Sequence, residues 1–406
     1  MIRNIVGAPV RGKDFFDREE FVDHVWSRLE TNNVLLAAPR RFGKTSLMYR
    51  LLDNPRPGWR LIHVDAESIR DPSNFIIALL DAALADQRLR QFLVKKWKTA
   101  GSWLRKLLGE IDVQTPWDVE LKLRFKEAIG QDWQERGEVL LKTLRDYDDR
   151  ERLLFLIDEL PVMLALFEDN DIDDTVIRAF LYWFRRLRTD PAAGLSNCRF
   201  LIGGSIGIEH ALSRISATAA FNDFERLALR ELSAPRAAEF LRLLLRTSKV
   251  SLSDKTQQAM LELIGTPIPY FLQVFVAEIA YATASGEKRI GPTAVEVLYR
   301  DRVLGVTNKS YFQHYFERLR YYEKPAERAA KAILKELAVN RSEAVPRTRL
   351  RALFRQEVGE PASEGSFNDL LWNLENDFYI HQSADGHSYF FASKILCDWW
   401  RRYYAF

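Results

Sequence analysis

Short apolar runs alternate with stretches of helical periodicity through the first half of the chain. The runs 34–37, 59–65, 153–157 and 199–205 are typical of buried strands, because strands covered on both faces are apolar at nearly every position. Between them, apolar residues recur every three or four positions, as at Phe21, Val25 and Leu29, which predicts amphipathic helices. Strands alternating with helices over about 200 residues predict an α/β fold with a parallel sheet.

The second half of the chain has a different pattern. From about residue 232 onward the periodicity is helical, and beyond about residue 326 three helical segments precede two short strands. These strands, 378–381 and 388–391, flank Asp385-Gly386, a hairpin turn signal. Helices followed by a two-stranded hairpin predict a winged helix. A smaller hairpin is predicted where residues 111–113 and 119–123 alternate.

Composition narrows the class of protein. With 406 residues, 47% of them hydrophobic and 28% charged, the chain is expected to fold into two or three globular domains. The net charge of +3 argues against nucleic-acid binding by the molecule as a whole. Cys198 and Cys397 are far apart and have no metal-type spacing. Without a signal peptide or a long apolar span, we expect a cytoplasmic protein that does not cross a membrane.

The segment that follows the first apolar run carries a phosphate-loop pattern. Gly43-Lys44-Thr45 ends the pattern G-x-x-x-x-G-K-[ST], in which Ala38 replaces the first glycine. The glycine lets backbone N–H groups turn toward phosphates, the lysine reaches the β and γ oxygens, and the threonine hydroxyl binds Mg²⁺. We expect Lys44 at a solvent-facing loop end. The predicted nucleotide-binding residues of this stretch are Pro39, Arg40, Arg41, Phe42, Gly43, Lys44, Thr45 and Ser46.

An acidic pair follows the third apolar run. Asp158 and Glu159 stand at the carboxyl end of the predicted strand 153–157, where ligands of open α/β sheets bind. We predict that Asp158 holds Mg²⁺ with Thr45, and that Glu159 orients or deprotonates the attacking water. Ser205, at the end of the fourth run, is either a sensor of the γ-phosphate or a turn residue.

Several motifs, in this order, resemble those of the archaeal-type ATPases of the STAND group. These proteins are relatives of AAA+ proteins, and the origin-recognition initiator ATPases are more distant cousins. The matching stretches are 15–20 (FFDREE), 35–48 (LLAAPRRFGKTSLM), 156–159 (LIDE), 204–207 (GSIG) with 221–224 (FNDF), 265–270 (GTPIPY) and 398–404 (DWWRRYY).

The resemblance implies a nucleotide site between an α/β core and a helical lid. It places Arg18 beside the base, Pro267 on the adenine or ribose side, and Ser205 as the sensor. Asp17 stands where a glycine is usual. We therefore predict an ATPase that uses ATP and Mg²⁺, with a P-loop core at about 1–230, a helical lid at 231–320 and a winged-helix domain at 321–406.

Nucleic-acid binding is left open by the charges. The final 83 residues, 324–406, carry twelve basic and eleven acidic side chains, and the candidate recognition helix 364–377 has four acids and no base, which repels phosphate. The preceding helix is basic, with Arg347, Arg349, Arg351 and Arg355. A second basic stretch, 88–106, includes Lys95 and Lys96 and has interleaved tryptophans. It either tracks a nucleic acid, packs as an amphipathic insertion, or meets another partner.

Three functional interpretations follow. The protein is a signalling or defence-type switch that acts on a protein partner, a DNA-handling ATPase that binds double-stranded DNA, or a nucleotide-dependent scaffold with negligible turnover. Arg226 and Arg230 are candidate fingers acting in trans if the protein oligomerises, and surface arginines otherwise.

Overall fold

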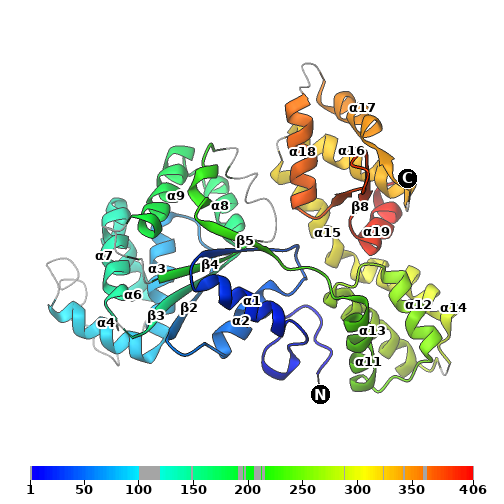
Figure 1. Ribbon diagram of the computed structural model, residues 1–406, viewed down its shortest axis with the longest axis horizontal. Coiled ribbons are helices and arrows are strands. Elements are labelled where there is room, and N and C mark those ends of the chain that lie inside the picture. Colours follow the sequence, from blue (N-terminus) through cyan, green and yellow to red (C-terminus); the bar gives the residue numbers. More distant parts are fainter. Residues whose placement is uncertain are drawn as a thin grey trace. The chain divides into compact units, whose positions relative to one another are not determined.

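The computed structural model describes residues 2–99, 119–147, 150–190, 195, 198–204, 212, 215–287, 289–322, 324–341, 343–359 and 364–405. The chain divides into two compact units (Figure 1). One, here called the sheet unit, comprises Glu19–Ala37 and Leu47–Ala228. The other, here called the helical unit, comprises Met1–Arg18, Ala38–Ser46 and Leu229–Phe406. The predicted three-domain division stays a prediction.

A five-stranded parallel sheet forms the centre of the sheet unit, which gives the fold an α/β class. Its strands are β1 (Asn33–Ala37), β2 (Trp59–Asp65), β3 (Arg152–Asp158), β4 (Cys198–Gly204) and β5 (Phe224–Ala228), in the spatial order β2-β3-β4-β1-β5. The first four are the predicted apolar runs. In register, Leu35 pairs with Ile202, and Asp65 pairs with Asp158 at the carboxyl edge.

Helices cover both faces of this sheet. Leu35, Phe155 and Phe200 belong to one buried cluster with residues of the neighbouring helices, and the alternate residues Leu36 and Leu154 are also fully buried. Figure 1 shows α8 and α9 on one side of the strands and α1 on the other. The helices of this part of the chain are α1 (Glu19–Leu29), α2 (Lys44–Asp53), α3 (Pro72–Ala85), α4 (Gln87–Thr99), α6 (Val119–Ile129), α7 (Trp133–Arg145), α8 (Leu160–Asp169) and α9 (Asp174–Thr189).

The predicted hairpin around residues 111–123 is wrong in its second half. Val119–Ile129 forms helix α6, while residues 111–113 lie outside the described part of the chain. Val119 and Leu123 are 73% and 56% exposed, whereas Phe125 and Ile129, one helical turn apart, are buried. The alternation of apolar residues therefore did not mark a buried strand face, and the helical spacing of the last two decided the structure.

The basic stretch at its described end is an amphipathic helix. In α4, Leu89, Leu93 and Val94 are buried while Lys95 and Lys96 are exposed. The apolar side packs within the core cluster of the sheet unit. This arrangement is the one expected for an insertion with a solvated basic face.

The helical unit contains a helical bundle, a connecting helix and a C-terminal module. The bundle consists of α11 (Ala234–Thr247), α12 (Asp254–Ile264), α13 (Pro269–Ala284) and α14 (Pro292–Leu298), which continues into a π-helical turn at Tyr299–Val303. The connecting helix is α15 (Lys309–Glu317). The side chain of Phe271 on α13 stacks on that of Phe312 on α15, with ring centroids 4.9 Å apart, and this contact joins bundle and connecting helix.

The C-terminal module begins with α16 (Lys324–Asn340), followed by β6 (Val345–Pro346), α17 (Arg347–Val358), α18 (Glu364–Asn376), β7 (Ile380–Gln382), β8 (Ser388–Phe391) and α19 (Lys394–Tyr404). Its strands form an antiparallel sheet in the order β6-β8-β7. Trp399 and Trp400 of α19 are fully buried in its core. In the described residues the module therefore has four helices and a short antiparallel sheet, and its assignment as a winged helix stays a prediction.

No helix in the described ranges is long and apolar enough to cross a membrane.

Candidate functional site

The phosphate-loop segment runs from the end of β1 to the first turn of α2. Gly43 has φ +98°, a backbone conformation that side chains rarely allow, and open space surrounds the position of a Cβ there. Glycine is therefore required by backbone conformation. Arg41 also has a positive φ, of 75°, whereas Ala38 does not. The first position of the motif thus has no conformational need for glycine.

Lys44 is the first residue of α2, and it is buried. Its side chain is 5% exposed, and its ammonium donates a hydrogen bond to the carbonyl of Ala38, 3.4 Å away. The expectation of a solvent-facing lysine is wrong, because the ammonium turns back into the loop. Thr45 next to it is half-buried. The hydroxyl of Ser46 accepts a hydrogen bond from the backbone N–H of Val10 at 3.0 Å, so Ser46 anchors the amino-terminal segment.

Aromatic side chains from the rest of the helical unit hold the loop. The hydroxyl of Tyr315 on α15 donates to the carbonyl of Arg40 at 2.8 Å. The guanidinium of Arg41 lies 4.5 Å from the ring centroid of Tyr270 on α13, and Phe42 lies 6.3 Å from Phe378 of the C-terminal module. Burial raises the pKa of Tyr315, so the hydroxyl remains a donor. Tyr270 lies in a motif that the sequence singled out, but nothing in the sequence marked Tyr315.

The two residues that the sequence assigned to the base side of the nucleotide, Arg18 and Pro267, both form hydrogen bonds to the segment 230–232. Arg18 donates to the carbonyl of Arg230 at 2.7 Å, and the carbonyl of Pro267 accepts from the backbone N–H of Leu232 at 3.1 Å. Asp17 has φ 49° and Arg18 has φ 128°. The first value explains why a glycine suits position 17, since left-handed backbone favours glycine, asparagine and aspartate. Burial lowers the pKa of Arg18, and the charges of Asp17 and Glu231 oppose that shift.

The acidic pair lies at the carboxyl edge of the parallel sheet. The Asp158 side chain is 3% exposed at the end of β3, and its Oδ1 accepts the backbone N–H of Glu159 at 3.0 Å. A Cβ at Gly203 of β4 would lie 2.4 Å from that same oxygen. The carboxylate therefore packs against bare backbone of the neighbouring strand, and only glycine leaves it room.

Glu159 has an unusual backbone. It precedes α8 with φ 55° and ψ 39°, in the left-handed region, which is costly for a residue with a Cβ. Such outliers persist where the surrounding structure imposes them, often at functional sites. The Glu159 side chain is half-buried. Ser205, the next residue after β4, lies outside the described residues together with 206–210.

One further acid at this edge has a local role. Asp65 ends β2, and its Oδ1 accepts the backbone N–H of Glu67 at 3.0 Å. It is therefore a turn residue. Among the described residues, no group of three or more histidine, cysteine, aspartate or glutamate side chains could hold a metal ion by itself. Mg²⁺ in nucleotide sites takes only one or two carboxylates, with phosphates and water completing its coordination.

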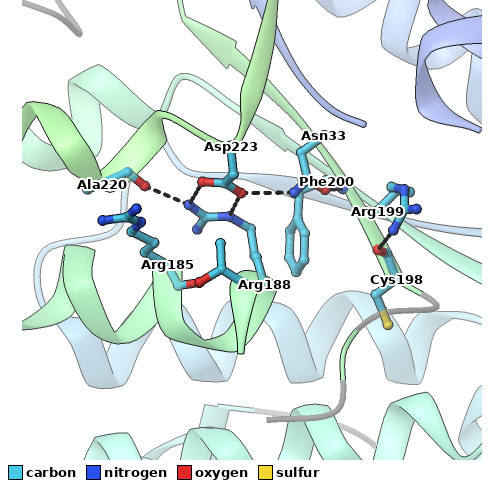
Figure 2. A network of polar contacts seen from close by, with 9 residues as sticks. Asn33, Arg185, Arg188, Cys198, Arg199, Phe200, Ala220 and Asp223 are labelled. Atoms are coloured by element: carbon cyan, nitrogen blue, oxygen red, sulfur yellow. Dashed lines mark hydrogen bonds and ion pairs between the residues drawn. The ribbon is translucent and has the colours of Figure 1, made fainter. Parts of the chain in front are cut away.

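A buried ion pair at the opposite, amino edge of the sheet was missed by sequence reasoning (Figure 2). The side chain of Arg188 on α9 is 1% exposed and binds both carboxylate oxygens of Asp223, at 2.8 and 2.9 Å. Asn33, the first residue of β1, donates to Asp223 at 3.0 Å and accepts from the backbone N–H of Phe200 at 3.0 Å. Burial lowers the pKa of Arg188, and its bonds to Asp223 oppose that shift. The network joins α9, β1, β4 and the start of β5.

The outward arginines proposed as trans-acting fingers, Arg226 and Arg230, are exposed. In the C-terminal module, Arg349 pairs with Glu336 at 3.0 Å, while Arg355 is exposed. Asp377, one of the four acids of the candidate recognition helix, is buried and accepts the hydroxyl of Tyr322 at 2.5 Å. It therefore does not face a ligand.

Comparison with solved structures identifies the fold of the chain. No family model and no curated protein sequence matches the chain. Among solved structures, a Walker-type ATPase of Pyrococcus abyssi is similar over 98% of this chain and 99% of its own, with a TM-score of 0.63 and 18% identity. The ORC2 protein of Aeropyrum pernix, in a structure of its ADPNP–ADP complexes, is similar over 94% of this chain and 92% of its own, with a TM-score of 0.50 and 12% identity. The chain therefore has the fold of these P-loop ATPases, from the parallel sheet through the C-terminal helices.

Proposed function

We propose that the protein binds ATP and hydrolyses it slowly with Mg²⁺, using the cycle to switch the arrangement of the core, the helical lid and the winged helix. The observation that carries the proposal is the loop 38–46, which joins a buried parallel strand to a helix whose first residue is Lys44. A fold shared with a Walker-type ATPase and with a protein described with ADPNP and ADP supports it.

The loop has the properties of a phosphate cradle. The backbone N–H groups of the first turn of α2 and the helix dipole favour an anion there. The positive φ of Gly43 turns the backbone as such a cradle needs. Lys44 is already held by the Ala38 carbonyl, so its ammonium is positioned before nucleotide arrives. We assign it to the β and γ oxygens, and residues 39–46 to the phosphates.

The chemistry of the acidic pair suits a divalent cation. A carboxylate as buried as that of Asp158 is usually compensated by a cation or by hydrogen bonds. The absence of a side chain at Gly203 leaves room for this carboxylate. We assign Asp158 and the Thr45 hydroxyl to Mg²⁺. That ion, when bound, supplies charge neutralisation at the phosphates.

Glu159 is assigned to the attacking water. Its left-handed backbone changes the direction of the Glu159 side chain relative to that of Asp158. Without this change, the two side chains would point to opposite faces, as consecutive residues of a strand do. The carboxylate orients the water or accepts its proton. Positioning and electrostatic stabilisation account for most of the rate in such sites.

The contacts of the loop support a switch. Tyr379 of the C-terminal module donates to the carbonyl of Tyr315 at 2.7 Å, and Tyr315 in turn donates to the carbonyl of Arg40. A change in the loop on nucleotide binding therefore reaches α15 and the C-terminal module through two hydrogen bonds. In this proposal a protein partner reads out the change, and oligomerisation brings Arg226 or Arg230 to a neighbouring site.

The proposal is tested by calorimetric titration of the full chain with ATP and Mg²⁺. Replacing Lys44 by alanine should remove measurable binding, because charge-assisted bonds to phosphate are worth about 1.5–3 kcal/mol each. Since Lys44 is buried, Lys44→Met keeps the side-chain volume and controls for packing loss, and circular dichroism checks the fold of both. Wild-type affinity in a folded Lys44→Met protein would refute the assigned site.

A DNA-binding ATPase is the second candidate. The observation that favours it lies in the C-terminal module, where α17 carries four arginines and one of the four acids on the neighbouring segment is buried. We propose that α17 contacts the DNA backbone, where basic side chains release counterions. Reversing Arg351 and Arg355 to glutamate should then abolish ATP-dependent binding of a duplex, measured by fluorescence anisotropy at two salt concentrations. Reversing Lys95 and Lys96 tests the other basic segment. Salt-independent binding, or none in the wild type, would exclude this candidate.

A further inference from the structure

A cavity lies within the helical unit. It has a volume of about 1050 Å³, at the upper end of the range for small-molecule sites. The bundle contributes the end of α12, α14 and the π-helical turn, and the C-terminal module contributes Arg341, which follows α16, together with β7, β8 and α19. None of residues 38–46 lines it.

The walls of this cavity are tied together by direct bonds. The Lys394 ammonium donates to the carbonyl of Leu263 at 2.8 Å, and the Tyr403 hydroxyl donates to the carbonyl of Leu304 at 3.0 Å. The Tyr299 hydroxyl donates to Asp398 at 3.0 Å. These three bonds join α19 to both ends of the bundle side. The cavity is therefore formed before any ligand enters, which reduces the ordering cost of binding.

Gly265 adds a packing constraint at one wall. It has φ +68°, and a Cβ there would lie 2.6 Å from Cβ of Lys394. The close approach keeps the stem of Lys394 against the bundle and its ammonium toward Asp398, 2.8 Å away. The wall of the cavity at Lys394 is thus fixed by the backbone at Gly265 rather than by a second side chain that could move.

The lining combines an apolar surface with an excess of positive charge. Five cationic side chains and three carboxylates line it, namely Arg300, Arg341, Lys394, Arg401 and Arg402, with Glu296, Asp301 and Asp398. Two of the carboxylates are compensated within the lining, since Arg300 binds Asp301 at 2.7 Å and Asp398 receives Tyr299 and Lys394. Arg341 also pairs with Asp398, at 3.5 Å, and Arg402 donates to the carbonyl of Arg300. The lining as a whole has two more cationic than anionic side chains.

Aromatic side chains provide the apolar part. Phe390 and Phe391 of β8 and Tyr299 line the cavity. His381 of β7 stacks on Phe390, with ring centroids 5.2 Å apart and planes at 19°. A flat ligand body can lie against such a surface, while guanidinium groups suit carboxylate and phosphate oxygens.

We propose that this cavity binds a small organic anion, with a planar or apolar body against Phe390, Phe391 and Tyr299 and an acidic group toward Arg401 and Arg402. The site is independent of the proposed nucleotide site. A ligand here contacts both the bundle and the C-terminal module, so it stabilises their present arrangement.

A pair of fluorescent probes tests the proposal on the full chain. Anilinonaphthalene sulfonate has an aromatic body and one negative charge, and phenylnaphthylamine is its uncharged counterpart. We expect saturable binding of the sulfonate at one site. Replacing Arg401 and Arg402 together by glutamine should weaken the sulfonate at least about tenfold, since bonds to charged groups are worth about 1.5–3 kcal/mol, and should leave the neutral probe within about twofold.

Two comparison variants locate the effect. The double variant Arg242→Gln and Arg246→Gln also removes two positive charges, from exposed positions of α11 that are four residues apart. It should change the affinity of neither probe. Ala392→Trp fills the cavity and should weaken both. An equal loss of sulfonate binding in the α11 variant would overturn the proposal. Unchanged sulfonate binding in the Arg401/Arg402 variant, together with unchanged binding of both probes in Ala392→Trp, would also overturn it. Arg401 is half-buried and the other three replaced arginines are exposed, so the arginine variants provide a test that does not depend on the folding of Ala392→Trp.

Discussion

The two edges of the parallel sheet in the sheet unit are built in opposite ways. At the amino edge, Arg188, Asp223 and Asn33 form a buried network in which each charged group meets a partner. At the carboxyl edge, Asp158 is buried against the bare backbone of Gly203, and Glu159 holds a left-handed conformation.

The difference separates an edge held by a network of side-chain bonds from the edge that carries the candidate site. The amino edge joins four elements through hydrogen bonds and rings, with Arg188 also lying 4.3 Å from the ring centroid of Phe184 and 4.6 Å from that of Phe224. Its contacts stabilise the fold. The carboxyl edge holds the left-handed backbone of Glu159 and the buried carboxylate of Asp158, two features that are common in active sites.

The largest expected effect comes from breaking the amino edge. Asp223→Ala leaves Arg188 buried without its carboxylate, which should lower the free energy of unfolding by about 3–5 kcal/mol. Urea unfolding followed by circular dichroism measures it. Glu225→Ala, two residues further along the chain, removes the half-exposed pair with Arg28 and the exposed hydrogen bond from Asn32, and should cost less than about 1 kcal/mol. Equal losses in the two variants would contradict the structural role of the Arg188–Asp223 pair.

An intermediate effect is expected at the carboxyl edge from a single methyl group. Gly203→Ala places a Cβ against Oδ1 of Asp158, so the carboxylate or Met48 must move, at a cost of about 1–3 kcal/mol. ATP affinity in Mg²⁺ should fall, and affinity in EDTA should change less.

The neighbouring glycine provides the control for that variant. Among the described residues, a Cβ at Gly204 would meet only the ring of Pro161, with Cγ at 3.1 Å and Cδ at 3.5 Å, so Gly204→Ala should be milder in its effects on stability and on Mg²⁺ dependence. If Gly203→Ala bound ATP and Mg²⁺ like the wild type, Asp158 would not be the metal ligand.

The smallest expected effect has the opposite sign. Glu159→Gly removes the Cβ from a left-handed position and should raise the free energy of unfolding by about 0.5–1 kcal/mol, because the relief of strain exceeds the added chain entropy. In α8, which Glu159 precedes, Ala165→Gly should lower the free energy of unfolding by about 1 kcal/mol. A thermal melt distinguishes the two signs, and destabilisation by Glu159→Gly would contradict the claim of strain.

Much of the sheet could be predicted from the sequence because its strands are buried on both faces. The run 59–65 forms β2 with the predicted bounds. The fifth strand, Phe224–Ala228, was missed because only Leu227 of its five residues is buried, as expected of an edge strand, and its pattern is not apolar.

The positions of the candidate site residues in the fold could be predicted from the spacing of the motifs. The directions of their side chains could not. Gly43, Lys44 and the pair Asp158-Glu159 follow strands that the apolar runs located. That Lys44 is buried could not be inferred, because it depends on the path of the loop back to Ala38. Arg188 looked like any other arginine of an amphipathic helix, and only its distance from Asp223 in space reveals its role.

The most direct test of the central claim is ATP turnover by the purified wild type and by Glu159→Gln, with and without double-stranded DNA at moderate salt. We predict Mg²⁺-dependent turnover in the wild type that falls about 10²–10⁴-fold in the variant, while the variant still binds ATP. Stimulation by DNA would favour the DNA-handling candidate, and indifference to DNA would favour the switch. Turnover that is absent from the wild type, or unchanged in Glu159→Gln, would contradict the assignment of the carboxyl edge as a hydrolytic site.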